Sequence, residues 1–166
     1  MKKAIVGLCL MMAPLGVNGS YAPPQGVSGL SQWVAEAMGE EPRDSDGLTV
    51  LVLPYDDESF SGGASLAWSG VTEGGKPIIG LRERKDGNLA ELWATLAHEL
   101  AHYYLADSDL CDEEARLRAE VFAYSVENQF RITYDVSPLS NEEFVRFVRL
   151  SVKEGVEECN AETTKH

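Results

Sequence analysis

Basic residues are scarce in this sequence, because 14 Lys and Arg stand against 27 Asp and Glu and the formal net charge is −13. Such a surface repels phosphate backbones and anionic lipid head groups, which argues against a nucleic-acid-binding protein. Long apolar runs are also missing, since no uninterrupted stretch reaches the roughly 18 to 20 residues of a membrane-spanning helix. With 166 residues and a hydrophobic fraction of 44%, the chain suits one soluble acidic domain.

The N-terminal residues differ in character from the rest of the chain. Two lysines precede an uncharged apolar run, residues 4–17, which gives way to small residues. This order is typical of a secretory signal, so we expect residues 1–22 to be removed on export to the periplasm or the exterior. The mature domain is then predicted over residues 23–155, followed by a polar, flexible tail over residues 156–166.

Cysteine is rare, with three residues in the whole chain. Cys9 lies in the predicted signal, so Cys111 and Cys159 form the pair of the mature chain. An even pair in an oxidising compartment favours a disulfide. Two free thiols are the alternative, because the sequence does not tell whether the two Cα atoms approach each other.

The first half of the mature chain has the pattern of a short helix followed by strands. Residues 31–39 read as a helix closed by glycine, and the β-branched run at residues 48–54 predicts a buried strand that proline ends. Two further strands are expected around Trp68 and Ile79, separated by a turn-forming Thr-Glu-Gly-Gly segment that predicts a hairpin. We therefore expect a small, mostly antiparallel sheet.

Three helices are predicted after these strands, over residues 88–104, 113–130 and 140–155. Strands that are followed by helices indicate an α+β domain, with the sheet packed on the first of these helices. Capping-box spacing marks two of the helix starts, Asn88 with Glu91 and Ser140 with Glu143.

The first of these helices carries the sequence His98-Glu99-Leu100-Ala101-His102, an H-E-x-x-H pattern. A step of four residues places both imidazoles on one helical face, where they suit a single metal ion. Zinc accepts neutral imidazole nitrogen, and a catalytic zinc site takes three protein ligands and leaves the fourth position to water. Glu99, about a third of a turn away, can reach that water as a general base and then as a general acid.

The two histidines lie nearly opposite the apolar face of their own helix. Their neighbours on the same face, Ala94, Thr95, Ala101 and Leu105, are mostly small and leave room for a metal ion and for a second helix. A pair of ordinary surface histidines is the alternative interpretation. At about 100° per residue, the apolar stripe is formed by Leu89, Leu92, Trp93, Leu96, Leu100, Tyr103 and Tyr104.

On these residues the chain resembles the zincin metallopeptidases, whose active-site helix carries HExxH. The similarity is specific at residues 98–102 and extends from about Ile78 to Phe130. It implies hydrolysis of peptide bonds in a peptide or protein substrate with one Zn²⁺ ion. The metzincin branch is excluded, because its motif would need Gly in place of Leu105 and His or Asp in place of Ser108.

The gluzincin branch takes its third zinc ligand from a glutamate on the following helix. Histidine is an improbable third ligand, since the remaining one is His166 at the end of the chain. Glu120 opens a Glu-Val-Phe-Ala segment that resembles the E-x-x-A pattern of gluzincins, so His98, His102 and Glu120 are the predicted metal ligands. Glu113, two turns earlier on the same helical face, is the alternative third ligand.

The resemblance also implies a substrate site, because an edge strand before the active-site helix binds extended peptides in zincins. Residues 78–81 occupy that place in the sequence, and a plain core strand is the alternative. An electrophilic partner for the developing oxyanion is expected too, but the sequence does not choose among Tyr103, Tyr104, Tyr124 and Tyr134.

A non-catalytic, zinc-stabilised binding module of the cell envelope is the alternative function. Structural zinc sites are closed by four protein ligands, whereas catalytic sites keep one position open. A fourth ligand such as Glu113 or Cys111 would favour the binding module, and an open position would favour the enzyme.

Overall fold

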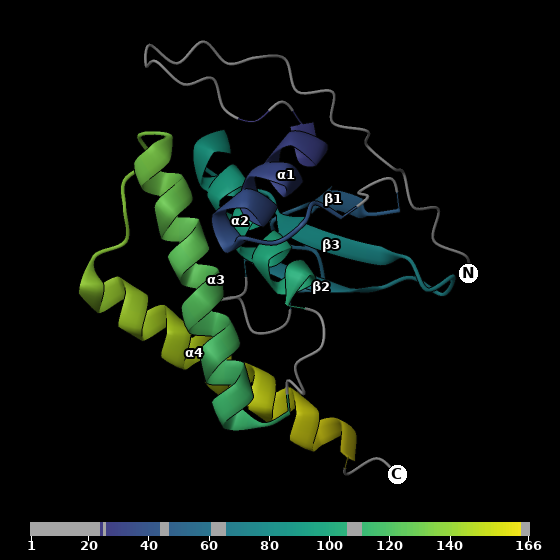
Figure 1. Ribbon diagram of the computed structural model, residues 1–166. Helices are drawn as coiled ribbons and strands as arrows, with labels where there is room; N and C mark the ends of the chain where they lie inside the picture. The colour runs from purple at the N-terminus through teal and green to yellow at the C-terminus, as the bar shows by residue number, and fades with distance from the viewer. Residues whose placement is uncertain (1–23, 25, 44–46, 61–65, 106–110, 164–166) are drawn as a thin grey trace.

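The computed structural model describes residues 24, 26–43, 47–60, 66–105 and 111–163, so the predicted signal peptide lies outside the described residues. These residues form an α+β fold, as predicted, with four helices and a three-stranded sheet (Figure 1). None of the helices among them combines the length and hydrophobicity needed to cross a membrane. In chain order the elements are α1 (Gly26–Met38), β1 (Thr49–Leu53), β2 (Ala67–Val71), β3 (Pro77–Arg82), α2 (Leu89–Tyr104), α3 (Glu113–Thr133) and α4 (Asn141–Thr163).

The sheet is mixed, with the strand order β1-β3-β2. The predicted hairpin is present, because β2 pairs antiparallel with β3 and the Thr72 amide donates to the Lys76 carbonyl across the turn. β1, however, pairs parallel with β3, so the expectation of a mostly antiparallel sheet is wrong. A short turn makes its two strands antiparallel, whereas the longer connection after β1 leaves the direction of pairing open.

β3 is the central strand, which overturns the prediction that residues 78–81 bind peptide substrate by strand addition. Ile78 pairs with Thr49 of β1 on one side and with Gly70 of β2 on the other. Both sides of β3 are therefore paired within the sheet. The outer strands are β1 and β2, and exposure increases along β2 toward Val71.

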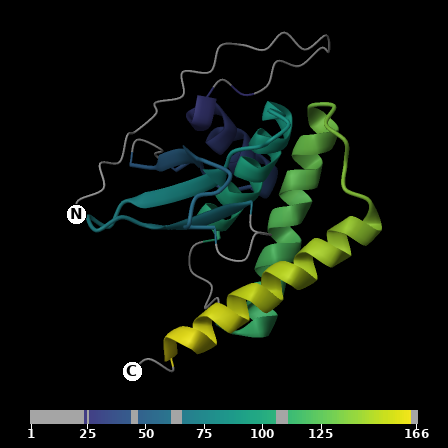
Figure 2. The same cartoon turned by 180° about the vertical axis from the view of Figure 1, so that it is seen from behind.

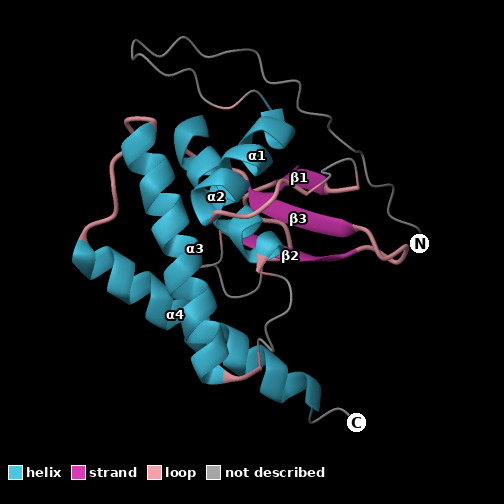
Figure 3. Ribbon diagram, viewed as in Figure 1, coloured by secondary structure: helices cyan, strands magenta, loops and turns pink. Residues whose placement is uncertain are grey.

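Helix α2 lies in the middle of the molecule, with the sheet on one side and α3 on another, and α4 packs on α3 (Figure 3). α2 packs against β2 and β3 on one side, against α1, and against α3 on another side. Its apolar stripe contributes Leu92, Leu96 and Leu100 to the core, which also contains Leu30 of α1 and Ile79 of β3. α2 is thus held by neighbours around most of its circumference, which fixes the direction of its remaining side chains.

Both ends of α2 are capped by polar groups. At the N-terminus the Asn88 side chain accepts from the amides of Ala90 and Glu91, as expected of an N-cap. The Glu91 carboxylate does not complete the capping box but binds Arg131 of α3 instead. At the other end, the guanidinium of Arg43 donates to the carbonyls of two residues of the last turn, Tyr103 and Tyr104.

α4 crosses the outer face of α3 and extends further than the sequence predicts (Figure 2). Its start has the predicted capping box, since the amide of Ser140 donates to the Glu143 carboxylate and the Glu143 amide donates to the Ser140 hydroxyl. The helix continues to Thr163, so the segment expected to be a flexible tail is helical over residues 156–163. The packing of α4 on α3 and a covalent bond near the end of α4 account for this extension.

That covalent bond is a disulfide between Cys111 and Cys159, which confirms the predicted pairing. The two Cα atoms lie 5.5 Å apart and the cysteines are separated by 48 positions in the sequence. Cys111 lies just before α3 and Cys159 lies near the end of α4. The bond therefore links the beginning of one helix to the end of the next.

Candidate metal centre

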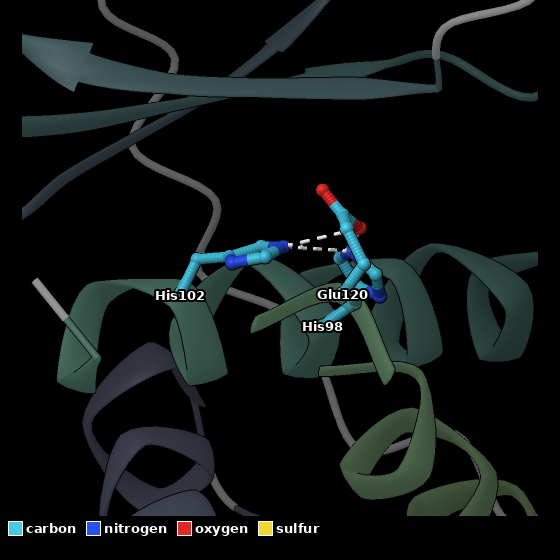
Figure 4. Close-up of side chains that lie close together, drawn as sticks. All are labelled: His98, His102 and Glu120. Atoms are coloured by element: carbon cyan, nitrogen blue, oxygen red, sulfur yellow. Dashed lines mark hydrogen bonds and ion pairs between the residues drawn. The ribbon is translucent and has the colours of Figure 1, made fainter. Parts of the chain in front are cut away.

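The structure brings together three of the residues that the sequence singles out. His98 and His102 lie one turn apart on α2, and Glu120 reaches them from α3 (Figure 4). The Nε2 atoms of the two histidines are 3.1 Å apart, and Glu120 Oε2 lies 3.5 Å from each of them. His98 and Glu120 are buried, at 7% and 5% exposure, whereas the His102 side chain is 16% exposed, so solvent reaches the group at His102.

These distances match the spacing of ligand atoms around a small cation. Zinc bonds to nitrogen and oxygen of about 2.0–2.2 Å place two ligand atoms of a tetrahedral site about 3.3 Å apart. The three atoms, at separations of 3.1, 3.5 and 3.5 Å, therefore outline one face of such a tetrahedron. Glu120 Oε2 is buried and has no hydrogen-bond donor among the described residues, so a cation would satisfy it. The group can hold a metal ion.

Small residues allow α3 to approach the histidine-bearing face of α2. Ala94 and Ala101 on α2, and Ala123 on α3, are fully buried. Alanine at such positions lets two helices pack closely, which brings a carboxylate on one helix within reach of imidazoles on the other. The expectation that small residues around the histidines leave room for a second helix is confirmed.

A second carboxylate, Glu127, lies behind the ring of His98. Its Oε2 is 3.4 Å from His98 Nδ1, the nitrogen that faces away from Glu120 and His102. Its Oε1 accepts from Arg131, which also binds Glu91 of α2. Sequence reasoning assigned no role to Glu127 and Arg131, although the seven-residue step from Glu120 to Glu127 places both on one face of α3.

The side chains of this cluster include more carboxylates than guanidinium groups, which favours a bound cation. Glu91, Glu120 and Glu127 supply three carboxylates, against one guanidinium from Arg131. Burial by itself lowers the pKa of His98, but Glu120 and Glu127 raise it to about 10. The metal-free chain therefore holds a proton on His98, which a metal ion would displace.

Glu120 responds to the same cluster in the opposite direction. Burial by itself raises the pKa of its carboxyl, but His102 and His98 lower it to about 2. The carboxylate is thus ionised at any ordinary pH, which is the state in which it can ligate a metal.

Glu99 and Tyr124 border the group. Glu99 is 9% exposed and lies close enough to His98 and Tyr124 to contribute to the raised pKa of each. The Tyr124 ring packs 4.2 Å from the His98 ring, centroid to centroid, and its hydroxyl pairs with Ser151 of α4 at 3.2 Å. Burial is the main reason why the pKa of Tyr124 is raised. Of the four tyrosines left open by the sequence, Tyr124 is the one whose ring packs on the ring of His98.

The alternative ligands do not join the group. Glu113 is exposed in the first turn of α3, and Cys111 is bonded to Cys159. In the part of the chain that the structure describes, the group consists of His98, His102 and Glu120. Protein atoms there fill three positions around the candidate ion.

Comparison with known proteins gives no match to a family profile, to a curated protein or to a solved structure. The zincin resemblance therefore depends on the sequence at residues 98–102 and on the glutamate of the following helix. Metal binding by His98, His102 and Glu120 stays a prediction.

Proposed function

We propose that this chain is a zinc-dependent peptidase with a zincin-like fold, in which His98, His102 and Glu120 hold one Zn²⁺ ion. The observation that carries the proposal is the triangle of two imidazole nitrogens and one carboxylate oxygen at 3.1, 3.5 and 3.5 Å. Two imidazoles and a carboxylate suit zinc better than magnesium or calcium, which prefer oxygen ligands. A zinc ion in this place would activate a water molecule and polarise the substrate carbonyl.

Glu99 is the proposed general base. It follows His98 directly in the sequence, so its carboxylate projects from the same turn of α2 without sharing the ligand face. It takes a proton from the attacking water and then donates that proton to the leaving amine. The amide C–N bond breaks, and the products are a free carboxylate and a free amine.

The three-ligand composition favours an enzyme over a zinc-stabilised binding module. A structural site would be closed by a fourth protein ligand. Within the described segments, neither candidate for that ligand joins the group, because Glu113 is exposed and Cys111 is bonded to Cys159. The remaining position is then available to water and substrate.

The outer edge of β2 is the proposed site for the substrate backbone. β2 packs against α2 and is an outer strand of the sheet. The Arg82 amide donates to the Leu66 carbonyl, and in an antiparallel ladder such bonded pairs alternate. By that alternation the amides of Ser69 and Val71 face away from β3, where an extended peptide can accept from them.

The disulfide supports the proposed export of the chain. Disulfides persist in oxidising compartments such as the periplasm or the cell exterior and are rare in the cytosol. The Cys111–Cys159 bond links the start of α3 to the end of α4, and such a bond suits a protein that works in an oxidising place.

The test measures metal content and peptide cleavage on the same purified samples. Wild type is expected to bind one zinc ion and to cleave, Glu99→Gln to keep zinc but lose cleavage, and Glu120→Ala to lose zinc. Glu113→Ala is the matched control on α3 and is expected to behave as wild type, because Glu113 is exposed. Zinc binding without cleavage of any peptide in a broad library would reject the peptidase. Absence of bound metal would reject the whole proposal.

A further inference from the structure

We infer that Glu127 is a positioning residue for His98, held in place by Arg131 and Glu91, and that this buried chain of charges sets the affinity of the metal site. The inference rests on the proposed zinc site and deepens it. It concerns residues that neither the HExxH motif nor the E-x-x-A pattern contains.

The argument starts from the two nitrogens of His98. A neutral imidazole that ligates through one nitrogen carries its proton on the other. His98 Nε2 faces Glu120 and His102, whereas Nδ1 is buried and lies 3.4 Å from Glu127 Oε2. Among the described residues Nδ1 makes no regular hydrogen bond, and the ion-pair contact at 3.4 Å makes Glu127 Oε2 the acceptor that faces it. Glu127 therefore favours the tautomer with the proton on Nδ1 and the free electron pair on Nε2.

Glu127 lies between two donors, and only a carboxylate suits that place. One oxygen faces His98, and the other accepts a hydrogen bond from Arg131 Nε at 2.9 Å and forms an ion pair with Arg131 Nη2 at 2.8 Å. Glutamate offers acceptors on both sides, whereas glutamine has one acceptor and would direct an N–H at a donor. Glu127→Gln keeps the volume of the side chain and breaks one of the two contacts.

Arg131 is itself fixed from the opposite helix. Its Nη1 and Nη2 donate to the two oxygens of Glu91, at 3.0 and 2.7 Å, and Nη1 also donates to the Ser137 carbonyl at 3.0 Å. Glu91 lies on α2, seven residues or two turns before His98. The same guanidinium thus ties α2 to α3 and holds the carboxylate that orients His98.

Stability alone is a weak reason for this arrangement. Taking charged groups out of water costs several kcal/mol per ion, and buried ion pairs are often replaceable by apolar residues without loss of stability. Arg131 and Glu127 are each 6% exposed. Placed directly behind a candidate ligand, they act as the outer partners that orient metal-binding histidines in proteins.

The chain offers a matched control on the same helix. Glu114 and Arg118 are also separated by four residues, and Arg118 Nη1 donates to Glu114 Oε1 at 2.6 Å. Their side chains are 79% and 65% exposed, so this pair has the same chemistry away from the site. Glu114→Gln is therefore the control for Glu127→Gln.

The experiment measures zinc affinity by competition with a chromophoric chelator, the visible absorption spectrum of bound Co²⁺, and thermal unfolding of the metal-free chain. We expect Glu127→Gln to weaken zinc binding about 10- to 100-fold and to alter the cobalt spectrum. Glu91→Gln removes one of the two hydrogen bonds to Arg131 and is expected to cause a smaller loss of zinc affinity. The zinc affinity of Glu114→Gln is expected to stay within roughly two-fold of the wild-type value. Since Glu91 is 19% exposed, its variant also serves if Glu127→Gln fails to fold.

The outcomes separate this inference from the proposed function. Wild-type zinc affinity and an unchanged cobalt spectrum in Glu127→Gln, even with a lower unfolding temperature, would show a merely structural role and overturn the inference. An equal loss in Glu114→Gln would overturn it too. If the affinities change as expected but wild type cleaves no peptide, the inference stands and only the peptidase is rejected. If wild type binds neither metal, both fail.

Discussion

The disulfide between Cys111 and Cys159 makes a prediction whose size follows from its position in the chain. The bond closes a loop across 48 positions. In the chain-entropy description, a loop of that length lowers the entropy of the unfolded chain by an amount worth about 4 kcal/mol at 25 °C. Removal of the bond is therefore expected to lower the free energy of unfolding by about 4 kcal/mol.

The assay is urea-induced unfolding of Cys111→Ala, Cys159→Ala and the double variant. Each single change breaks the same bond, so all three proteins are expected to lose nearly the same stability, and reduced wild type is expected to match them. This non-additivity distinguishes a shared bond from two independent sites, because the losses of unfolding free energy at independent sites would add. Losses in the single variants that sum in the double variant would refute the reasoning, as would a reduced wild type as stable as the oxidised one.

Three further predictions concern the substrate edge, the sheet and the metal. Ser69→Pro removes an outward-facing amide from β2 and is expected to raise the KM for peptide substrates at unchanged zinc content. Ser69→Ala keeps the amide and is expected to keep the wild-type KM. Equal KM values in the two variants would contradict substrate binding at this edge. Gly80→Ala places a methyl group against the Trp68 ring and is expected to cost about 1–3 kcal/mol of unfolding free energy, measured in urea. Removal of zinc by a chelator is expected to lower the unfolding temperature. Zinc at about 100 times its Kd is expected to restore about 2.7 kcal/mol of the free energy of unfolding. An unfolding temperature that does not depend on zinc would contradict a native metal site.

The sequence predicted well what depends on neighbours along the chain. The helix from residue 89 to residue 104, its Asn88 cap, the β2–β3 hairpin and the capping box at Ser140 all follow from spacings of a few residues. Such features are local, so the residue pattern contains most of the information that forms them.

Errors arose where segments distant in the sequence meet. The side of β3 on which β1 pairs, and its direction, depend on a connection too long to constrain them, so β3 proved to be a central strand. Glu91 fits a capping box by its spacing, yet its carboxylate binds Arg131, 40 positions away, because the two helices pack face to face. The predicted end of α4 was too early, since packing on α3 and the Cys159 bond extend the helix.

The candidate site divides in the same way. The sequence by itself determined that His98 and His102 share one face and that Glu99 lies beside them, because the rotation of an α-helix per residue is fixed by backbone geometry. The choice of Glu120 over Glu113, and the position of Glu127 behind His98, needed the packing of α3 on α2. A helix carries several carboxylates on each face, and only the rotation and offset of the second helix decide which of them lie within ligand distance of the first.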